Sequence, residues 1–136
     1  MTKRKTKQRE VILEVLTQAS RPLSRAELHQ ETLAQLPGIG FATVSRAVND
    51  LLEQKELVQL QYPGQINRYE IASDTEHPHL LCVRCQKIFD LPEGMPELTL
   101  PKVKGFKIGG YEVLYFGQCT QRKTCPHGPN GQTRDS

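Results

Sequence analysis

The sequence predicts an α+β fold in two parts: an N-terminal winged helix-turn-helix and a small C-terminal domain of strands that a metal ion holds together. Three segments with helical periodicity precede two short strand-like runs. Four cysteines, arranged as two pairs, follow in the second half of the chain. The 136 residues suffice for two small domains, and a domain of about 60 residues is marginal without a metal or a partner subunit.

The first two helices are indicated by periodicity and by capping residues. Apolar residues at helical spacing predict a helix over residues 8–18, and Arg21-Pro22 ends that segment. Ser24 and Glu27 have the spacing of a capping box, in which each residue satisfies a backbone N–H at the start of a helix. A second helix is therefore expected from this point to Leu36.

The third helical segment has the clearest periodicity and is the candidate recognition helix. Its apolar face carries Val44, Ala47, Val48, Leu51 and Leu52. Thr43 is the expected N-cap. In a winged helix-turn-helix, the third helix enters the major groove and its first polar residues reach base edges. The candidate DNA-reading residues are Thr43, Ser45, Arg46 and Asn49; the alternative is an ordinary solvated helix face.

A hairpin is expected after the third helix. Residues 57–62 and 66–72 are strand-like, and Pro63-Gly64-Gln65 between them has turn chemistry. This hairpin is the expected wing, which touches the DNA backbone in such folds. Basic residues also begin the chain, with no acid among them: Lys3, Arg4, Lys5, Lys7 and Arg9. We interpret them as a basic arm that contacts nucleic acid, with a solubilising tail as the alternative.

Composition argues against a membrane or secreted protein. The sequence has no run of about 18 apolar residues that could span a bilayer, and residues 1–9 are too polar for a signal-peptide core. A cytoplasmic protein is therefore expected. In a reducing compartment, paired cysteines favour a metal site over a disulfide.

The second domain is expected to follow a hinge at residues 73–76, where periodicity stops. The predicted domains are residues 1–72 and 77–125, followed by a polar tail, 126–136, that we expect to be disordered. Residues 80–91 and 106–117 resemble strands, interrupted by cysteines and by Gly109-Gly110. The proline-containing segment 92–101 has room for only a short helix.

The cysteines predict a structural zinc site. Cys82, Cys85, Cys119 and Cys125 could fill all four positions of a tetrahedral ion. Because five residues separate the second pair, His127 is an alternative to Cys125. A catalytic zinc needs an open position, which four thiolates do not leave, and a redox pair needs exposed thiols without zinc. An enzyme is therefore not expected.

A second candidate metal site surrounds the hinge and has nitrogen and oxygen donors. It consists of Glu70, His77, His79 and Asp90. Two histidines one residue apart point to the same side of an extended strand. With a carboxylate on each flank they could bind Zn²⁺, Fe²⁺ or Mn²⁺ as a regulatory ion. The alternative is a set of ordinary surface residues.

Motifs along nearly the whole chain make the sequence similar to the ferric uptake regulator family of bacterial metal-dependent repressors. The matching segments are residues 6–9, 42–46, 68–70, 77–85 and 117–119. The resemblance implies a winged-helix DNA-binding domain, a C-terminal α/β dimerisation domain, and a homodimer on a palindromic operator in double-stranded DNA. It also implies that the four cysteines hold structural zinc and that Glu70, His77, His79 and Asp90 form the sensing site.

Several residues depart from the family pattern. A sensing-site histidine falls at Arg21 or Pro22 here, and another histidine is replaced by Tyr111. Ser45 stands where the recognition helix usually carries tyrosine. Glu56 replaces a glycine that usually follows this helix, so that a left-handed backbone there would be strained.

The expected function is a metal-responsive transcriptional repressor that controls metal uptake genes for zinc or iron. A peroxide-sensing repressor dependent on iron or manganese is one alternative, and a DNA-binding module with a vestigial hinge site is another. All cysteines are assigned to structural zinc, so the sensing site is restricted to nitrogen and oxygen ligands. Water, His29 or no group replaces the missing histidine.

Overall fold

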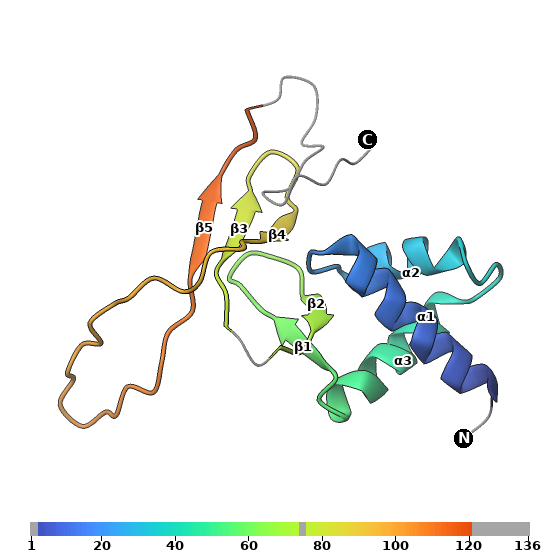
Figure 1. The fold of residues 1–136 in the computed structure, drawn as a ribbon, viewed down its shortest axis with the longest axis horizontal. Helices are drawn as coiled ribbons and strands as arrows, with labels where there is room; N and C mark the ends of the chain where they lie inside the picture. The colour runs from blue at the N-terminus through green and yellow to red at the C-terminus, as the bar shows by residue number, and fades with distance from the viewer. Residues whose placement is uncertain (1–2, 74–75, 121–136) are drawn as a thin grey trace. The chain divides into compact units, whose positions relative to one another are not determined.

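The computed structural model describes residues 3–73 and 76–120, which form three helices followed by five strands (Figure 1). Contacts divide the chain into two compact units, Met1–Asp74 and Thr75–Ser136. This boundary lies inside the range predicted for the hinge. None of the described helices combines the length and the apolar character needed to cross a bilayer. The calls on Cys125, His127 and the tail 126–136 lie outside the described residues.

The first unit packs three helices around one core. The helices are α1 (Lys3–Ala19), α2 (Arg25–Leu33) and α3 (Phe41–Glu53). Most of the apolar residues expected to point inward are buried; they are Val11, Ile12, Val15, Leu16, Val44, Ala47, Val48 and Leu51, all at most 7% exposed. Leu52, also predicted on this face, is only partly buried against the core. Burial of these side chains is the main stabilising contribution to the unit, because each buried aliphatic side chain contributes about 1.5 to 3 kcal/mol.

The basic residues do not form an arm separate from the first helix, because α1 begins at Lys3; their contact with nucleic acid stays a prediction. The residues expected to precede the helix form its first turns, where lysine, arginine and glutamine are favourable helix formers. Lys5 and Lys7 are exposed. The first helix therefore carries the basic charge on its own surface.

The ends of α2 and α3 differ from the expected ones. The capping box of Ser24 and Glu27 is present at the start of α2, but the helix ends at Leu33 and the chain continues in turns. Gly40, in an extended conformation, is the N-cap of α3, with no side-chain cap. The predicted Thr43 cap is therefore wrong: the N-cap lies three residues earlier, at Gly40, and Thr43 lies in the first turn of the helix.

A hairpin completes the first unit. Strands β1 (Leu57–Leu60) and β2 (Arg68–Ile71) pair antiparallel, with Val58 opposite Glu70. Leu23 and Tyr69 also exchange backbone hydrogen bonds of 3.0 and 2.8 Å. The hairpin is thus joined directly to the segment between α1 and α2.

The end of α3 contains a left-handed residue, but at a position other than the expected one. Lys55 has φ of 63°, whereas Glu56 does not have a positive φ. The N–H of Lys55 donates to Leu52 at 3.0 Å and that of Glu56 donates to Leu51 at 2.9 Å. These two bonds form a Schellman motif, which usually places glycine at the position of Lys55.

We expect Lys55→Gly to raise the free energy of unfolding by about 0.5 to 1 kcal/mol. A non-glycine residue in this conformation costs roughly 1 to 2 kcal/mol, and the greater freedom of glycine in the unfolded chain offsets part of the gain. Urea unfolding followed by circular dichroism measures the difference. Glu56→Gly is the control and should give no gain; equal stabilisation by both variants would contradict the assignment of strain to Lys55.

The second unit is a three-stranded sheet. Strands β3 (His79–Cys82), β4 (Ile88–Asp90) and β5 (Leu114–Gly117) lie in the order β4-β3-β5. Strand β3 pairs antiparallel with β4 and parallel with β5. The predicted strand 80–91 is therefore a hairpin, and the strand expected over 106–117 is confined to its last residues. Residues 92–101 form no helix; three prolines there remove backbone donors.

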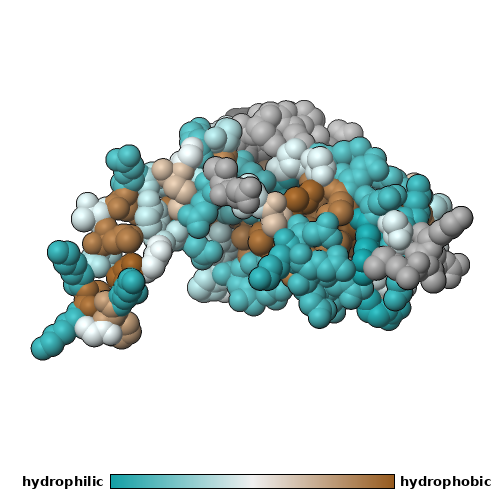
Figure 2. Space-filling model, turned by 60° about the horizontal axis from the view of Figure 1, so that its bottom comes forward, coloured by the Kyte–Doolittle hydropathy of each residue, from teal (hydrophilic) through white to brown (hydrophobic). Residues whose placement is uncertain are grey.

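The loop between β4 and β5 leaves apolar side chains exposed. Figure 2 shows hydrophobic residues gathered along this loop, which extends away from its own sheet in Figure 1. The largest are Leu98, Leu100, Val103 and Phe106, between 38% and 74% exposed. On β5, Phe116 is also 74% exposed. Contiguous exposed apolar surface of this kind is typical of an interface with another protein.

Candidate metal centre and nucleic-acid interface

Two histidines and one aspartate of the second unit converge on a single point. The register of β3 and β4 places His79 opposite Asp90, and His77 lies two residues before β3. The Nε2 atoms of His77 and His79 lie 3.2 and 3.1 Å from the same oxygen, Oδ1 of Asp90. The two imidazole ring centroids are 4.7 Å apart. Two ring nitrogens and a carboxylate oxygen are thus held together by local strand pairing.

This trio has the donor chemistry of a metal site. His79 is 6% exposed, whereas the side chains of His77 and Asp90 are 25% and 32% exposed. The site is therefore half-buried and reachable from solvent. Imidazole and carboxylate donors suit zinc, iron and manganese, and separations of about 3 to 3.5 Å are those between neighbouring ligands of four-coordinate zinc. The residues present fit such an ion.

Glu70, the fourth predicted ligand, belongs to the first unit. It lies on β2 opposite Val58 and is 9% exposed. A carboxylate with so little exposure needs polar or cationic partners. Its strand neighbour Tyr69 is bonded to Leu23, so β2 holds Glu70 in a fixed place within the first unit.

The residues at and near the missing histidine are engaged in other contacts. Arg21 is 2% exposed and its Nη2 lies 3.0 Å from Oε2 of Glu27. A guanidinium is always protonated and has no lone pair for a metal. His29, the suggested substitute, is hydrogen-bonded through Nε2 to the carbonyl of Ile39 at 2.9 Å and packs edge-on against Phe41. His29 therefore stabilises the turn before α3.

Three of the four cysteines lie in one cluster. Cys82 ends β3, Cys85 lies in the turn to β4, and Cys119 follows β5. They pack together with Phe89, and Cys82 and Phe89 are each 4% exposed. The parallel pairing of β3 with β5 brings Cys119 back to the first pair.

The spacing of these thiols differs from that of the histidine site. Within residues 3–73 and 76–120, the one gathering of three or more ligand side chains close enough to share an ion is the set that includes His77, His79 and Asp90. The three described cysteines thus lie near one another, but their sulfur atoms are not close enough to share an ion in this arrangement. Cys125 lies outside the described residues, so the predicted four-thiolate set stays a prediction.

A groove between α1 and α3 collects most of the predicted DNA-binding residues. It is lined by Lys5, Gln8, Arg9, Thr43, Arg46, Ala47, Asn49 and Asp50. Arg46 and Asn49 are exposed. Arg9 forms an ion pair with Asp50 at 3.1 Å, which anchors α1 to α3 and neutralises part of its charge. The remaining cations of the groove, Lys5 and Arg46, give it a positive character.

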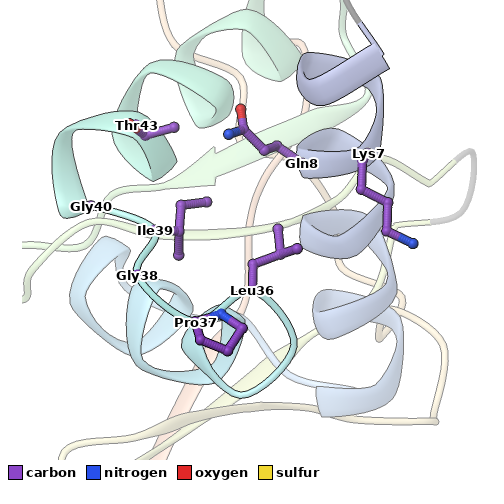
Figure 3. Close-up of a pocket in the computed structure, with 8 residues that line it drawn as sticks. All are labelled: Lys7, Gln8, Leu36, Pro37, Gly38, Ile39, Gly40 and Thr43. Atoms are coloured by element: carbon purple, nitrogen blue, oxygen red, sulfur yellow. The ribbon is translucent and has the colours of Figure 1, made fainter.

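Two other predicted residues, Lys7 and Ser45, lie close to this groove. Lys7 belongs to a neighbouring pocket between α1 and the loop that enters α3. In Figure 3, Gln8 points from α1 towards α3, and Leu36 and Ile39 point into the space between them. Ser45 faces α2, where Arg25 donates to its carbonyl at 2.9 Å. Sequence reasoning missed Arg25, because no motif marks it.

A family model for the ferric uptake regulator family matches residues 1–114. The chain belongs to the ferric uptake regulator family. A ferric uptake regulation protein of Campylobacter jejuni is 32% identical over 120 residues, which cover 84% of this chain and 76% of that protein. The resemblance inferred from the motifs is thus confirmed.

Solved structures of this family have the same fold. The peroxide stress regulator of Campylobacter jejuni aligns with a TM-score of 0.61 at 25% identity, covering 88% of this chain and 90% of that chain. A zinc-bound manganese uptake regulator aligns with a TM-score of 0.66 at 19% identity, covering 88% and 89%. Proteins of the ferric uptake regulator family are DNA-binding transcription regulators that act as dimers and control metal uptake or the response to peroxide. The winged-helix class predicted from the sequence is therefore confirmed at the level of the family fold.

Proposed function

We propose that the protein is a cytoplasmic, dimeric repressor whose binding to a palindromic operator is controlled by a divalent metal at His77, His79, Asp90 and Glu70. The observation that carries the proposal is the convergence of two histidine Nε2 atoms on one oxygen of Asp90. Such an arrangement places three donors of suitable chemistry together. When bound, the ion would supply a positive charge to these imidazole and carboxylate ligands.

The contacts of Tyr69, the strand neighbour of Glu70, suggest how this site would influence DNA binding. Glu70 lies next to Tyr69 on β2. The Tyr69 hydroxyl accepts a hydrogen bond of 2.9 Å from Arg25, which in turn contacts Ser45 on α3. Two residues, Tyr69 and Arg25, thus connect the metal ligand on β2 to the recognition helix. An ion changes operator affinity only to the extent that it binds the DNA-competent state better, typically by about 1 to 3 kcal/mol.

The DNA interface would use the groove between α1 and α3 and the wing. Lys5 and Arg46, together with Lys3, Arg4 and Lys7, are proposed as phosphate or base contacts. Each phosphate neutralised should contribute roughly −0.9 to the slope of log affinity against log salt. The exposed apolar residues of β5 and of the loop before it support a dimer interface in the second unit.

A selection experiment followed by a metal titration tests the proposal. Full-length protein would select duplexes from a random library with Zn²⁺, Mn²⁺ or anaerobic Fe²⁺, and anisotropy would measure affinity for the selected duplex with each ion and with a chelator. Binding that rises with one ion supports the metal-responsive repressor. Binding that is equal in every condition would establish the rival, a DNA-binding module with a vestigial site.

The same assay addresses the second candidate function, peroxide sensing. The N/O donor set without a thiolate favours it as an alternative, as does the likeness to the peroxide stress regulator of Campylobacter jejuni. Iron-loaded protein would be treated with hydrogen peroxide before the anisotropy measurement. Loss of DNA binding that manganese-loaded protein does not show would identify a peroxide sensor.

We expect Asp90→Asn to reduce the metal-induced gain in operator affinity by about 5- to 150-fold, the usual size of such a coupling. Both histidine Nε2 atoms converge on Oδ1 of the Asp90 carboxylate. An amide oxygen in its place is a weaker ligand for a hard ion. Anisotropy with and without the ion measures the gain. The control is Glu93→Gln, an exposed residue of the same unit that loses the same charge. If both variants keep the full gain, the site does not regulate.

A further inference from the structure

Arg25 makes several polar contacts with neighbouring elements of the first unit. It lies at the start of α2. Its Nε donates to the Tyr69 hydroxyl at 2.9 Å, and its guanidinium carbon lies 4.9 Å from the centre of the same ring. Its Nη1 donates to the carbonyl and the hydroxyl of Ser45. Its Nη2 donates to Oδ1 of Asn49 at 2.7 Å.

These contacts fix which atoms of Asn49 remain for a ligand. Arginine has donors only, so the Asn49 atom that faces it must be the amide oxygen. Asn49 is otherwise exposed on the outer face of α3. The amide nitrogen, with two N–H groups, is therefore the part of Asn49 that is turned away from Arg25. The Ser45 hydroxyl oxygen likewise accepts from Arg25 and is left with its proton to donate.

The chemistry of base readout makes this orientation consequential. Asparagine usually recognises adenine with both amide atoms, accepting from N6 and donating to N7. Because the Asn49 oxygen lies against Arg25, the amide presents its nitrogen rather than both atoms to a base and loses the accepting half of that pair. It can still donate to O6 and N7 of guanine and to O4 of thymine, whereas at adenine it would reach only N7 and would leave the N6 donor without an acceptor.

We propose that Arg25 is a specificity-determining residue of the operator interface: by holding the Asn49 oxygen, it converts Asn49 from an adenine reader into a donor that selects guanine or thymine. This inference rests on the proposed DNA-binding function. Arg25 acts through Asn49 and is a positioning residue. A side chain held before binding also loses less conformational entropy on contact, which favours a defined choice of base.

The residue at position 45 is part of the same arrangement. Ser45 is small, and its hydroxyl and carbonyl both receive hydrogen bonds from one nitrogen of Arg25. A bulky side chain at position 45 would compete for the space that the guanidinium occupies. Arg25 and Ser45 therefore form a matched pair that leaves Asn49 in one orientation.

Selection of duplexes from a random library would test the proposal, using full-length protein with Zn²⁺, Mn²⁺ and anaerobic Fe²⁺ in turn. The variants are Arg25→Ala, Arg25→Lys, Asn49→Ala and the double variant of Arg25→Ala with Asn49→Ala. The base preference that disappears in Asn49→Ala locates the position that Asn49 reads. At that position the unaltered protein should select guanine or thymine.

Arg25→Ala should shift the preference at this one position towards adenine by about 5- to 150-fold, the discrimination that a bidentate pair provides. Arg25→Lys, which retains the charge but not the fork, should shift it in the same direction. The double variant should show no preference there. Because preferences are ratios within one protein sample, a partly unfolded variant still gives a valid result.

Three results would overturn the inference. Unaltered protein that selects adenine at the Asn49-dependent position contradicts it directly. The second is an Arg25→Ala variant that keeps the base preference but binds every sequence more weakly, with a smaller slope of log affinity against log salt. That result would make Arg25 a phosphate contact. An Asn49→Ala variant that keeps every preference would show that Asn49 reads no base. Absence of any selected sequence for the unaltered protein with all three ions would instead reject the proposed DNA-binding function.

Discussion

Replacing Cys82 by serine is expected to unfold the second unit while the first unit remains folded. The sheet of the second unit has three short strands. In this sheet, Cys82 and Phe89 form a small buried cluster against which Cys85 and Cys119 pack. A core of this size is too small to be stable without a further constraint. Binding of a structural zinc in such a site contributes on the order of 10 to 16 kcal/mol at neutral pH. Losing that binding free energy would exceed the whole free energy of unfolding of a small domain.

Zinc content and amide NMR spectra measure this outcome. The serine variant should lose one zinc per chain, and the amide signals of residues 76–120 should collapse to the narrow range of an unfolded chain while those of residues 3–73 keep their dispersion. Val83→Ser is the control, because Val83 is the exposed neighbour, at 46%, within the same turn. A serine variant at Cys82 that keeps a dispersed second unit would show that the cysteines do not hold the fold through a metal.

The core of the first unit could be predicted from the sequence because periodicity directly encodes burial. Val44, Val48 and Leu51 lie one or two turns apart and are fully buried. The ends of the same helix could not be predicted as well. Backbone torsions at Gly40 and Lys55 set the ends of α3, and residue type predicts such torsions weakly, since Lys55 occupies a position that glycine usually fills.

The second unit was predicted less well because its contacts are distant in sequence. Strand β5 pairs parallel with β3 across a long loop, and nothing in the local pattern of residues 106–112 indicates that they form no strand. The nearness of His79 and Asp90 follows from the register of β3 and β4 and was anticipated from residue chemistry alone.

The hydrogen bonds of Arg25 could not be predicted from sequence motifs. Ser45 and Asn49 were expected to be DNA readers because of their place on the recognition helix. Their contacts with Arg25 depend on how α2 packs against α3, which no local pattern reveals. A long cationic side chain facing two small polar residues is a signal that only the packed structure provides.

Glu27→Gln is expected to lower the free energy of unfolding of the first unit by about 2 to 3 kcal/mol at neutral pH. The substitution leaves the buried Arg21 guanidinium, with 1% of its side chain exposed, without its carboxylate partner. Removing one member of a buried pair costs about 3 to 5 kcal/mol. Because 29% of the Glu27 side chain is exposed, solvent reduces this figure. Glutamine can still accept from the Ser24 backbone, so the capping box is retained.

The effect should depend on pH in a defined direction. Burial alone would raise the pKa of Glu27, but the hydrogen bond from the Ser24 backbone and the charge of Arg21 outweigh it and lower the pKa below its usual value of 4.5. A group with a lowered folded pKa contributes stability that is complete above its unfolded pKa and is lost as pH falls through the folded pKa. The difference between the unaltered protein and Glu27→Gln should therefore be constant near neutrality and shrink below about pH 4.5.

Urea unfolding of the two proteins from about pH 7 down to about pH 3, followed by helical circular dichroism, measures this difference above, at and below the usual pKa of glutamate. Glu10→Gln, at an exposed position on α1, is the control, and it should leave the free energy of unfolding nearly unchanged. A loss of stability in Glu27→Gln that does not begin to shrink as the pH falls below 4.5 would assign the effect to the steric fit of the amide rather than to the charge of the carboxylate. A loss of stability that vanishes in acid would assign the contribution of Glu27 to its charge. It would also show that this charge is what allows Arg21 to be buried.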